Sequence, residues 1–387
     1  MNTDSTYQKF IAGLTSFRRD IHQNPEFGFE ETRTARQVAA LLKASGLEVC
    51  EGVGGTGVVG TLSKGAGSRS IMFRADMDAL KIEEEKTAAR QHVSARDGYM
   101  HACGHDGHTA MLIGAAQQLA ADGGFDGTVH FVFQPAEEWG RGMLAMLDDD
   151  LLRRFPASEA YALHNAPGVA IGKFETCGGA FRSAEDNFEI TIQGKGCHSA
   201  RPHQGRDALV AAAAVITALQ TVVSRVIQPG KPAVISCTDM TTSGTRNVST
   251  GTVVISGDCR SFSPDVSELI ETEMRRVVEG VAAAHGCAGR LDYSRVFVPA
   301  VNDEALVEEL TRILGDEFGG DALNAKALAN TASEDFGQLI ARIPGCLVNI
   351  GNGNSAPLHN PAYDFCDEAI PFGVRFFVAI CRDRLKG

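Results

Sequence analysis

The stretch His101-Ala-Cys-Gly-His-Asp-Gly-His108 places three imidazoles and one thiol within eight residues. Its two glycines allow the backbone to turn tightly enough for several of these side chains to converge. Thiolate and neutral imidazole bind zinc and similar divalent ions, and nickel, cobalt or manganese are compatible with the same ligand types. The alternative is a polar loop whose histidines are merely solvated, but this explanation would have to hold for several histidines within one turn. We therefore predict a metal site, whose remaining ligands come from other parts of the chain.

Two predicted strands near this stretch end in carboxylates. Residues 70–78 are typical of a buried strand that ends in Asp76 and Asp78, although either aspartate alone could be a solvated strand end. After an Ala/Leu-rich helix at 109–121, a second strand leads directly into Glu137 and Glu138. Two adjacent carboxylates can divide the chemical work, since one can bind a metal while the other moves protons.

A third predicted strand, at 160–163, ends in His164 and Asn165. Three consecutive strand ends therefore deliver side chains that bind metals. In α/β folds, ligands bind at the carboxyl ends of the strands. The sequence thus predicts an α/β domain with a metal site at one edge of its sheet.

Composition restricts the classes of function. The chain has 387 residues, enough for two domains, with 44% hydrophobic and 22% charged residues. A net charge of −12 argues against a nucleic acid or an anionic membrane as partner, since both need a basic face. The ten cysteines are scattered, the N-terminus lacks a signal-peptide pattern, and no apolar run has the length of a membrane span. We predict a cytoplasmic protein with reduced cysteines, among which Cys103 is the candidate ligand.

The pattern of elements changes between residues 184 and 297. The predicted order there is β-α-β-β-α-β, the split βαβ arrangement of a ferredoxin-like domain. Because the earlier αβ pattern resumes afterwards, we predict an inserted domain at 184–297 and a catalytic domain formed by 1–183 and 298–387. The predicted elements of the insertion are strands at 188–193, 233–240, 252–258 and 291–298 and helices at 206–227 and 265–285.

Seven motifs, in this order, resemble the M20 family of metallo-aminohydrolases, in particular its hippurate hydrolase and N-acyl-amino-acid amidohydrolase branch. Auxin-conjugate hydrolases are similar as well, and the match runs from about residue 15 to the C-terminus. Each motif alone is weak, but seven in the right order and spacing are specific. The motifs are RADMDAL (74–80), MHACGHDGHTA (100–110), QPAEE (134–138), LHN (163–165), GKGCHSARPH (194–203), SEDF (333–336) and LHNPAYDF (358–365).

The resemblance implies a zinc-exopeptidase-like catalytic domain that holds two divalent metal ions per subunit (zinc, manganese, nickel or cobalt). Glu137 is implied as the general base, and Asp78 as the carboxylate that orients His105. Asp76, His101 and His108 match the motifs without a ligand role, and we expect them to be structural. The implied metal ligands are Cys103, which bridges the two ions, His105, Glu138, His164 and His359.

For the inserted domain, the resemblance implies a lid and dimerisation role. His198 matches a histidine that helps to hold the developing oxyanion, often across the dimer. Asn247 and Arg260 match residues that bind the substrate carboxylate or the scissile carbonyl, although each could be an ordinary surface residue. The sequence departs from the family pattern at Lys81, Cys197, Ser249 and Cys366, and these departures leave the substrate identity open.

The predicted function is metal-dependent hydrolysis of the amide bond of N-acyl amino acids, which gives a carboxylic acid and a free amino acid. The alternatives are a dipeptidase or a deaminase on the same scaffold, a metal-binding or ligand-sensing protein without catalysis, and a redox protein that uses Cys103. Retention of Glu137 argues against the sensing protein, and the lack of a CxxC partner argues against the redox protein. We expect a small-molecule substrate and a homodimer or homotetramer through the inserted domain, with Thr252–Ile255 as an apolar sheet edge.

Overall fold

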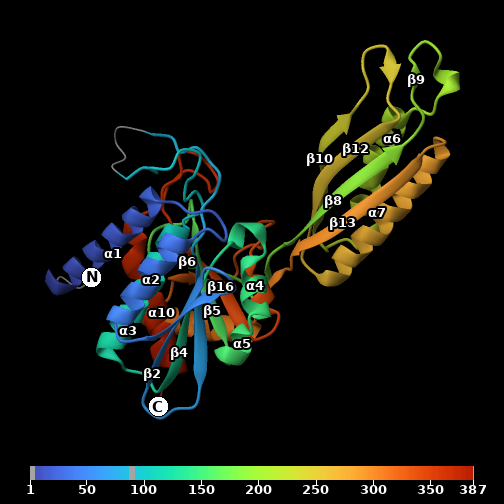
Figure 1. The fold of residues 1–387 in the computed structure, drawn as a ribbon. Helices are drawn as coiled ribbons and strands as arrows, with labels where there is room; N and C mark the ends of the chain where they lie inside the picture. Colours follow the sequence, from blue (N-terminus) through green and yellow to red (C-terminus); the bar gives the residue numbers. More distant parts are fainter. Residues whose placement is uncertain (1–4, 87–91, 387) are drawn as a thin grey trace. The chain divides into compact units, whose positions relative to one another are not determined.

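The computed structural model describes residues 5–86 and 92–386, which form two compact units (Figure 1). The first unit runs to Phe181 and includes Ala300–Ala329 and the chain from Asp335 on. The second unit holds Arg182–Pro299 and Asn330–Glu334. The chain thus leaves the first unit twice, once for the long insertion Arg182–Pro299 and once for the short segment Asn330–Glu334.

The short segment Asn330–Glu334 lies with the second unit, whereas the sequence placed the whole C-terminal part in the first domain. Hydrogen bonds explain this difference. The backbone N–H of Ser183 donates to the carbonyl oxygen of Ala332 at 3.1 Å, and the guanidinium of Arg260 donates to Ser333 Oγ at 2.6 Å. These bonds connect residues far apart in sequence, so local patterns do not reveal them.

The first unit is built on an eight-stranded mixed sheet in the order β1-β2-β4-β3-β5-β16-β6-β15. Its four central strands are parallel, from β4 through β3 and β5 to β16. Their carboxyl ends therefore meet at one edge of the sheet, where the candidate ligands lie. The strand bounds are β1 Glu48–Val53, β2 Gly57–Lys64, β3 Ser70–Asp76, β4 Gly127–Gln134, β5 Ala160–Ala166, β6 Phe174–Glu175, β15 Leu323–Asn324 and β16 Gly345–Gly351.

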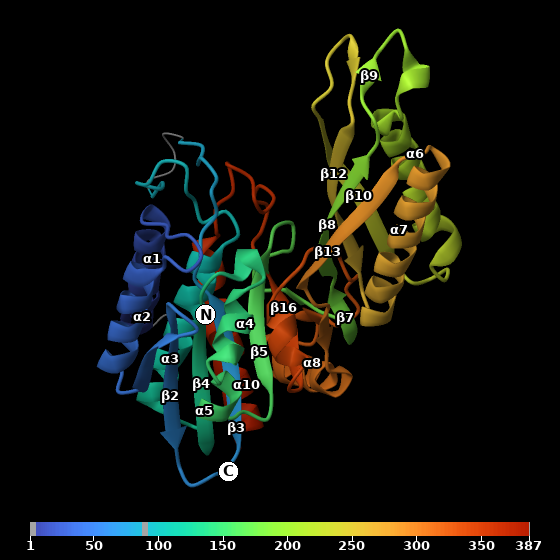
Figure 2. The ribbon, with the colours of Figure 1, turned by 45° about the vertical axis from the view of Figure 1, so that its right-hand side comes forward.

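Helices cover both faces of this sheet (Figures 1 and 2). Successive strand residues point to opposite faces, so Phe73 and Phe131 pack into one core while Met72 and Val132 pack into the other. The first core is shared with α1 (Ser5–Gln23), α2 (Thr32–Ala44), α3 (His105–Asp122), α8 (Glu304–Phe318) and α10 (Ile370–Arg384). The second is shared with α4 (Gly142–Asp148), α5 (Leu151–Arg154) and α9 (Phe336–Ile340).

The second unit has the predicted β-α-β-β-α-β order (Figure 2). Its antiparallel sheet runs β10-β12-β8-β13, the strand order of a ferredoxin-like fold. Phe188, Ile190 and Ile192 alternate along β8 and bury one sheet face against the two helices. The main elements are β8 Ala184–Gln193, α6 Ala208–Thr221, β10 Ala233–Thr242, β12 Thr252–Ser261, α7 Pro264–Ala284 and β13 Ala288–Phe297, with a small pair formed by β9 Cys197–His198 and β11 Val248–Ser249.

The prediction that Thr252–Ile255 forms a sheet edge is wrong. These residues begin β12, which pairs with β10 on one side and with β8 on the other. Val253 and Ile255 are fully buried in the core of the second unit. The edge strands of this four-stranded sheet, among the described residues, are β10 and β13. A continuous apolar run is typical of an interior strand, because an exposed apolar edge invites aggregation.

Helix α6 and the turn of π-helix that follows it, Ala208–Val226, form one helix long and apolar enough to span a membrane. The mean hydropathy of its apolar stretch is 1.8, and only 28% of this stretch is buried. The buried side packs on the sheet of the second unit through Ala212, Val215 and Leu219. Leu209 and Val210 lie on the exposed side, so this unit presents an apolar helix face.

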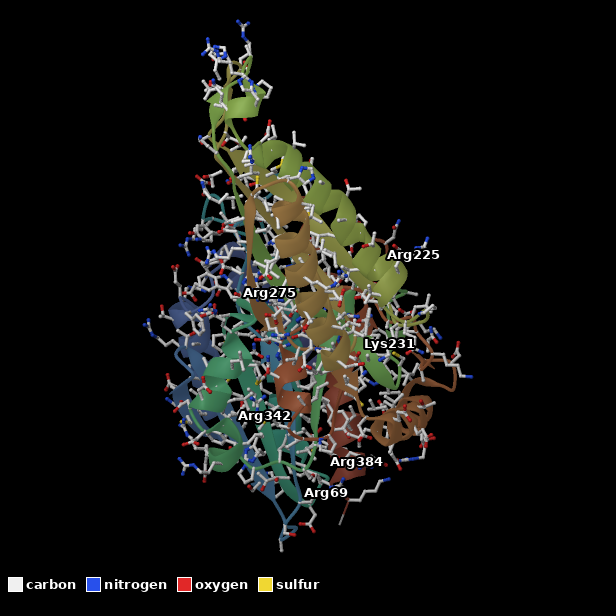
Figure 3. The ribbon with its side chains drawn as sticks, turned by 90° about the vertical axis from the view of Figure 1, so that its right-hand side faces the viewer. Arg69, Arg225, Lys231, Arg275, Arg342 and Arg384 are labelled. Atoms are coloured by element: carbon white, nitrogen blue, oxygen red, sulfur yellow. The ribbon has the colours of Figure 1, made fainter. Side chains whose placement is uncertain are left out.

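Figure 3 labels several basic residues of both units, and some of them form ion pairs with nearby acids. In the first unit, Arg69 and Arg384 both bind Glu159. In the second, Lys231 binds Asp265 at 2.5 Å. The positive charge at these positions is thus neutralised locally.

Candidate metal centre

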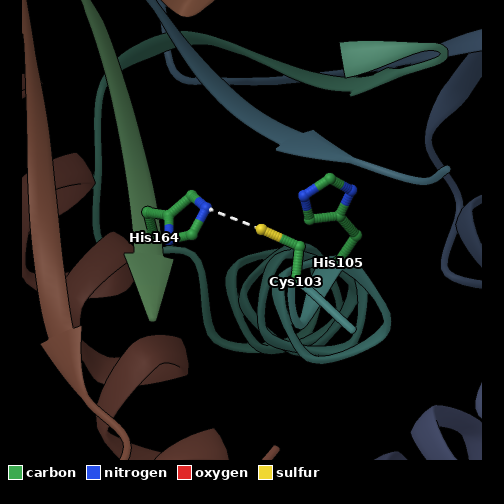
Figure 4. Close-up of side chains that lie close together, drawn as sticks. All are labelled: Cys103, His105 and His164. Carbon is green, nitrogen blue, oxygen red and sulfur yellow. Dashed lines mark hydrogen bonds between the residues drawn. The ribbon is translucent and has the colours of Figure 1, made fainter. Parts of the chain in front are cut away.

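The loop before α3 brings Cys103 and His105 together (Figure 4). Gly104 between them has a left-handed backbone (φ 87°). A Cβ at this position would lie 2.5 Å from Asn165 Oδ1 and 2.6 Å from the Tyr363 hydroxyl. Only glycine therefore allows the sharp turn that starts α3 at His105 and leaves the thiol beside the imidazole.

His105 is hydrogen-bonded to Asp78, the carboxylate that the family resemblance implies as its orienting partner. With its proton assigned to Nδ1, the ring donates to the Asp78 carbonyl oxygen at 2.9 Å and to Asp78 Oδ1 at 3.1 Å. The other carboxylate oxygen of Asp78 accepts from the backbone N–H of Glu138 at 3.1 Å. Asp78 thus fixes two of the predicted ligands and leaves His105 Nε2 free to bind an ion.

His164 enters from the end of β5. Its Nδ1–H donates to the Asn165 carbonyl oxygen at 2.9 Å, and its Nε2 lies 3.5 Å from Cys103 Sγ (Figure 4). The ligand atoms of Cys103, His105 and His164 lie within 4.8 Å of one another, and all three residues are buried. One ion could contact all three.

Glu138 and His359 complete a second group with Cys103, whose three ligand atoms also lie within 4.8 Å of one another. Glu138 Oε1 is 3.3 Å from His359 Nε2 and 3.8 Å from His105 Nε2. The His359 side chain is 52% exposed, so the centre is open to solvent on this side. Glu137, the predicted base, lies 4.0 Å from His105 Nε2.

His108 and Asp76 lie beside this centre. His108 Nδ1 contacts Asp76 Oδ1 at 2.7 Å, and its Nε2 contacts Asn165 Oδ1 at 2.8 Å. Both ring nitrogens of His108 thus have partners in the protein. Asp76 also accepts from Arg74 at 2.8 Å and lies 3.8 Å from His105 Nε2. These contacts place His108 and Asp76 next to the candidate metal ligands, where they support the structure around them.

The donor set fits divalent metal ions. His105 Nε2 is buried and has no hydrogen-bond partner among the described residues. Such an orphaned polar atom is costly unless a cation satisfies it. One thiol, three imidazoles and one carboxylate are the ligand types that zinc and similar ions take. Two overlapping groups of candidate ligands share Cys103, so the arrangement offers ligands for two ions.

The pKa shifts reflect crowding of acids and bases in a buried site. Burial and the nearby Glu138 carboxylate raise the pKa of the Cys103 thiol. Burial opposes protonation of His105, but the Asp76 and Asp78 carboxylates outweigh it and raise the His105 pKa. Burial likewise raises the pKa of Asp78. A bound cation would stabilise the thiolate and the carboxylates directly.

The model of peptidase family M20/M25/M40 matches residues 72–383, about four-fifths of the chain. The chain belongs to this family. Among its curated relatives, hippurate hydrolase of Campylobacter jejuni is 33% identical over 95% of this chain and 96% of its own length. An N-acetyl-L-cysteine deacetylase of Bacillus subtilis is 34% identical over 95% of this chain and 86% of its own. An IAA-amino acid hydrolase of Arabidopsis thaliana is 34% identical over 94% and 84%.

Solved structures agree with this membership. A putative aminohydrolase from methicillin-resistant Staphylococcus aureus superposes with a TM-score of 0.90 at 29% identity, over 98% of both chains. The YXEP protein of Bacillus subtilis, a dinuclear metal binding peptidase of the M20 family, gives 0.86 at 29% identity, over 98% of this chain and 99% of its own. The predicted family, the α/β fold class and the assignment as a metal-dependent amidohydrolase are confirmed.

In this M20 chain, the remaining predicted site residues lie in the second unit. The structure brings His198 and Asn247 together, since the pair β9–β11 places His198 opposite Val248 and Ser199 N–H donates to the Asn247 carbonyl oxygen at 3.1 Å. Both side chains are exposed.

Arg260 lies apart from this pair, near the other end of β12. Its guanidinium contacts Glu185 at 2.6 Å and Asp258 at 2.8 Å. Two carboxylates therefore already surround it. Binding a substrate carboxylate would require Arg260 to exchange one of them.

A buried ionic network that was not predicted from the sequence lies behind the metal loop. Arg18 is fully buried and contacts Asp106 at 3.2 Å, Asp364 at 3.3 Å and Asp367 at 2.8 Å. His22 contacts Asp106 at 2.9 Å. The sequence did indicate this network, because Arg18 and His22 share the apolar, buried face of α1 with Leu14 and Ile21. A charged residue on an apolar helix face predicts a buried partner.

Proposed function

We propose that this M20 chain hydrolyses the amide bond of N-acyl amino acids, either hippurate-like or with N-acetyl or aryl-acyl groups, to a carboxylic acid and a free amino acid. The observation that carries the proposal is the pairing of Glu137 and Glu138. Glu138 faces two metal-binding imidazoles, while Glu137 is a further buried carboxylate 4.0 Å from His105. A carboxylate beside a metal centre, in addition to its ligand set, is what general acid–base catalysis needs.

Two divalent ions fit the centre, and zinc, manganese, nickel and cobalt are the candidates by ligand type. Cys103, His105, Glu138, His164 and His359 are the residues that would hold them. Such ions supply Lewis acidity, which polarises a carbonyl oxygen and makes water more acidic. The protein's part is to position the donors, and Asp78 does this for His105 and Glu138.

Glu137 acts as the base and then as the acid. Its carboxylate takes a proton from the attacking water and afterwards gives that proton to the departing amine, which is the sequence of events that amide cleavage requires. His198 donates a hydrogen bond to the carbonyl oxygen as negative charge develops there. Removal of one such donor typically lowers turnover by about 10²–10³-fold. Asn247 and Arg260 bind the substrate's polar groups, with Arg260 on the carboxylate.

The positions of these residues favour an active site shared by two subunits. Arg260 pairs with Glu185, four residues after the chain leaves the first unit at Phe181. His198 and Asn247 lie beyond the opposite end of β12, which begins at Thr252. Arg260 is eight positions after Thr252 along the strand, which corresponds to about 26 Å at ~3.3 Å per residue. We therefore propose that Arg260 acts with His198 of the partner subunit.

The same unit presents a surface suited to a homodimer. β10 is an edge strand on which Val234 and Met240 are exposed. Beside it, α6 exposes Leu209 and Val210. Pairing of two β10 strands about a twofold axis would extend the sheet across both subunits. It would also cover the exposed apolar side chains of β10 and of α6.

Sedimentation of the intact protein tests the homodimer. We expect a dimer, or a tetramer built from dimers, at micromolar concentration. Met240→Glu should shift the protein toward the monomer. Val301→Glu, at an equally exposed apolar position of the first unit, is the matched control. A wild-type monomer would exclude the shared site.

The compartment is part of the same proposal. All ten cysteines, each within the described residues, are free thiols. A metal centre that depends on the Cys103 thiolate favours a reducing compartment, so the cytoplasm is the proposed location.

Product analysis tests the activity. Metal-loaded protein and its Glu137→Ala variant are incubated with benzoylglycine, N-acetyl amino acids, indoleacetyl-aspartate and dipeptides. We expect one class of N-acyl amino acid to be cleaved, and the variant to keep its metal but lose the activity. Ammonia as product would indicate a deaminase, and two amino acids a dipeptidase. Tight metal binding without cleavage of any substrate would favour the sensing protein.

A further inference from the structure

Four aromatic side chains gather next to the metal centre of the first unit. This aromatic cluster consists of Phe27, Phe29, Tyr99 and Trp139. The Trp139 ring meets Phe27 edge-on at a centroid distance of 5.0 Å and Phe29 at 6.4 Å, and Phe27 meets Tyr99 at 6.2 Å. These edge-to-face contacts fix the rings against one another. Trp139 nevertheless keeps 42% of its surface exposed.

The cluster is joined directly to the catalytic residues. Trp139 ends the single turn of 3₁₀-helix Glu137–Trp139, so it follows the proposed base and a proposed ligand without a gap. Phe27 forms a bridge with Ala79, the residue after Asp78. A Cβ on Gly28 would lie 3.0 Å from Ala136 Cβ and 3.7 Å from Asp78 Oδ2. The backbone between the two phenylalanines therefore packs against the residues that support the metal centre.

The backbone at Phe29 is strained. Its φ is 64°, in the left-handed region that large side chains avoid. Ala136 (φ 47°), which directly precedes Glu137, the candidate ligand His359 (φ 59°) and Asp150 (φ 60°) share this feature. Strained residues persist where the surrounding structure holds them, and they gather at functional sites. The surrounding contacts, which include the Trp139 ring, thus hold Phe29 in this conformation despite its cost.

A cation lies over the face of Phe27. The Lys81 ammonium is 4.1 Å from the ring centroid, and no carboxylate pairs with it among the described residues. Its contact occupies one face of that ring. The indole of Trp139 is thus the large exposed apolar surface of the cluster that remains for a ligand.

We propose that Trp139, supported by Phe27 and Phe29, forms the acyl subsite and selects aromatic acyl groups. The inference rests on the proposed function. The carboxylate of the amino acid half is assigned to Arg260 of the second unit. The acyl half of the substrate would then bind to the first unit. There the exposed indole belongs to Trp139, which directly follows Glu138 in the sequence. An aryl ring stacked on this indole is held next to the carbonyl that is attacked.

Kinetics with a matched pair of substrates test the subsite. For wild type, Trp139→Ala and Trp139→Phe, kcat/KM is measured on benzoylglycine and acetylglycine. Loss of one aromatic contact should lower the benzoyl-to-acetyl ratio by about 10-fold in Trp139→Ala, with partial recovery in Trp139→Phe. Tyr7→Ala, which removes a half-buried aromatic ring on α1, is the control and should leave the ratio unchanged. An unchanged ratio in Trp139→Ala, or an effect on the choice of amino acid instead, overturns the proposal.

A second measurement separates the subsite from the activity. Trp139 is the chain's single tryptophan, so its fluorescence reports on this position alone. Metal-loaded Glu137→Ala protein is titrated with benzoylglycine and with acetylglycine. We expect a saturable change in emission with the benzoyl compound and none with the acetyl compound. Equal responses, or no response, overturn the subsite. A selective response without any hydrolysis by wild type supports the subsite while the proposed function fails.

Discussion

Replacing Asp78 with asparagine removes one negative charge and one acceptor from the support of the metal centre. In the wild type, one carboxylate oxygen accepts from His105 and the other from the backbone N–H of Glu138, both at 3.1 Å. An amide has a single oxygen, so it can serve only one of these donors and presents an N–H to the other. Hydrogen bonds to charged groups contribute about 1.5–3 kcal/mol. Loss of one corresponds to a metal affinity lower by about 10–100-fold, the usual cost of removing such a support.

Competition with a fluorescent chelator measures this affinity. Asp97→Asn makes the same change of charge at an exposed residue that pairs with Lys86 at 2.8 Å, and it should bind metal as wild type does. Thermal melting of both metal-free variants shows whether the fold is kept. If Asp78→Asn folds and its metal affinity changes less than twofold, Asp78 does not position the ligands and our reading of the centre is incorrect.

Gly104→Ala should abolish tight metal binding, because its Cβ would meet Asn165 Oδ1 at 2.5 Å. Gly123 also has a positive φ (63°), but a Cβ there would lie in open space, so Gly123→Ala should bind metal normally in the same titration. Arg18→Met should destabilise the first unit by about 3–5 kcal/mol in denaturant unfolding, because it leaves the buried Asp106 and two partly buried carboxylates without their cation. A loss within experimental error would contradict this role. Hydrogen bonds to Asp106 and Glu84 outweigh burial and raise the pKa of His22 from 6.5 to about 9, so its stabilisation is complete below pH ~6.5 and is lost as the pH rises through ~9. His22→Gln should therefore remove about 3 kcal/mol of pH dependence from the unfolding free energy of the metal-free protein, and an unchanged profile would assign that dependence to other groups.

The strand-end ligands were predictable from the sequence because their positions follow from local patterns. β3, β4 and β5 are buried apolar runs, and the polar residues after them had to lie at one edge once the strands were parallel. Glu138 and His164 therefore lie in two candidate ligand groups that share Cys103. His359 was different, since it lies on a loop with a left-handed backbone, and only the family resemblance indicated it.

Contacts between distant parts of the chain were not predictable. Arg18 and Asp367 are 349 residues apart, and no local pattern relates them. Asp335 is similar: it accepts from Arg74 and Gln134, yet the SEDF motif gave it no role. The apolar start of β12 was assigned to an edge although its composition suits an interior strand. Strand order depends on tertiary packing, which the alternation of side chains does not encode.

The central claim is that two bound ions and Glu137 together cleave an N-acyl amino acid. The most direct test is the rate of glycine release from benzoylglycine as metal is added back to metal-free protein, with bound metal per chain measured in the same samples. The account predicts negligible activity without metal and a maximum at two ions per chain, with no activity at any occupancy in Glu137→Gln. Full activity at one ion per chain, or glycine release that is independent of metal, would contradict it.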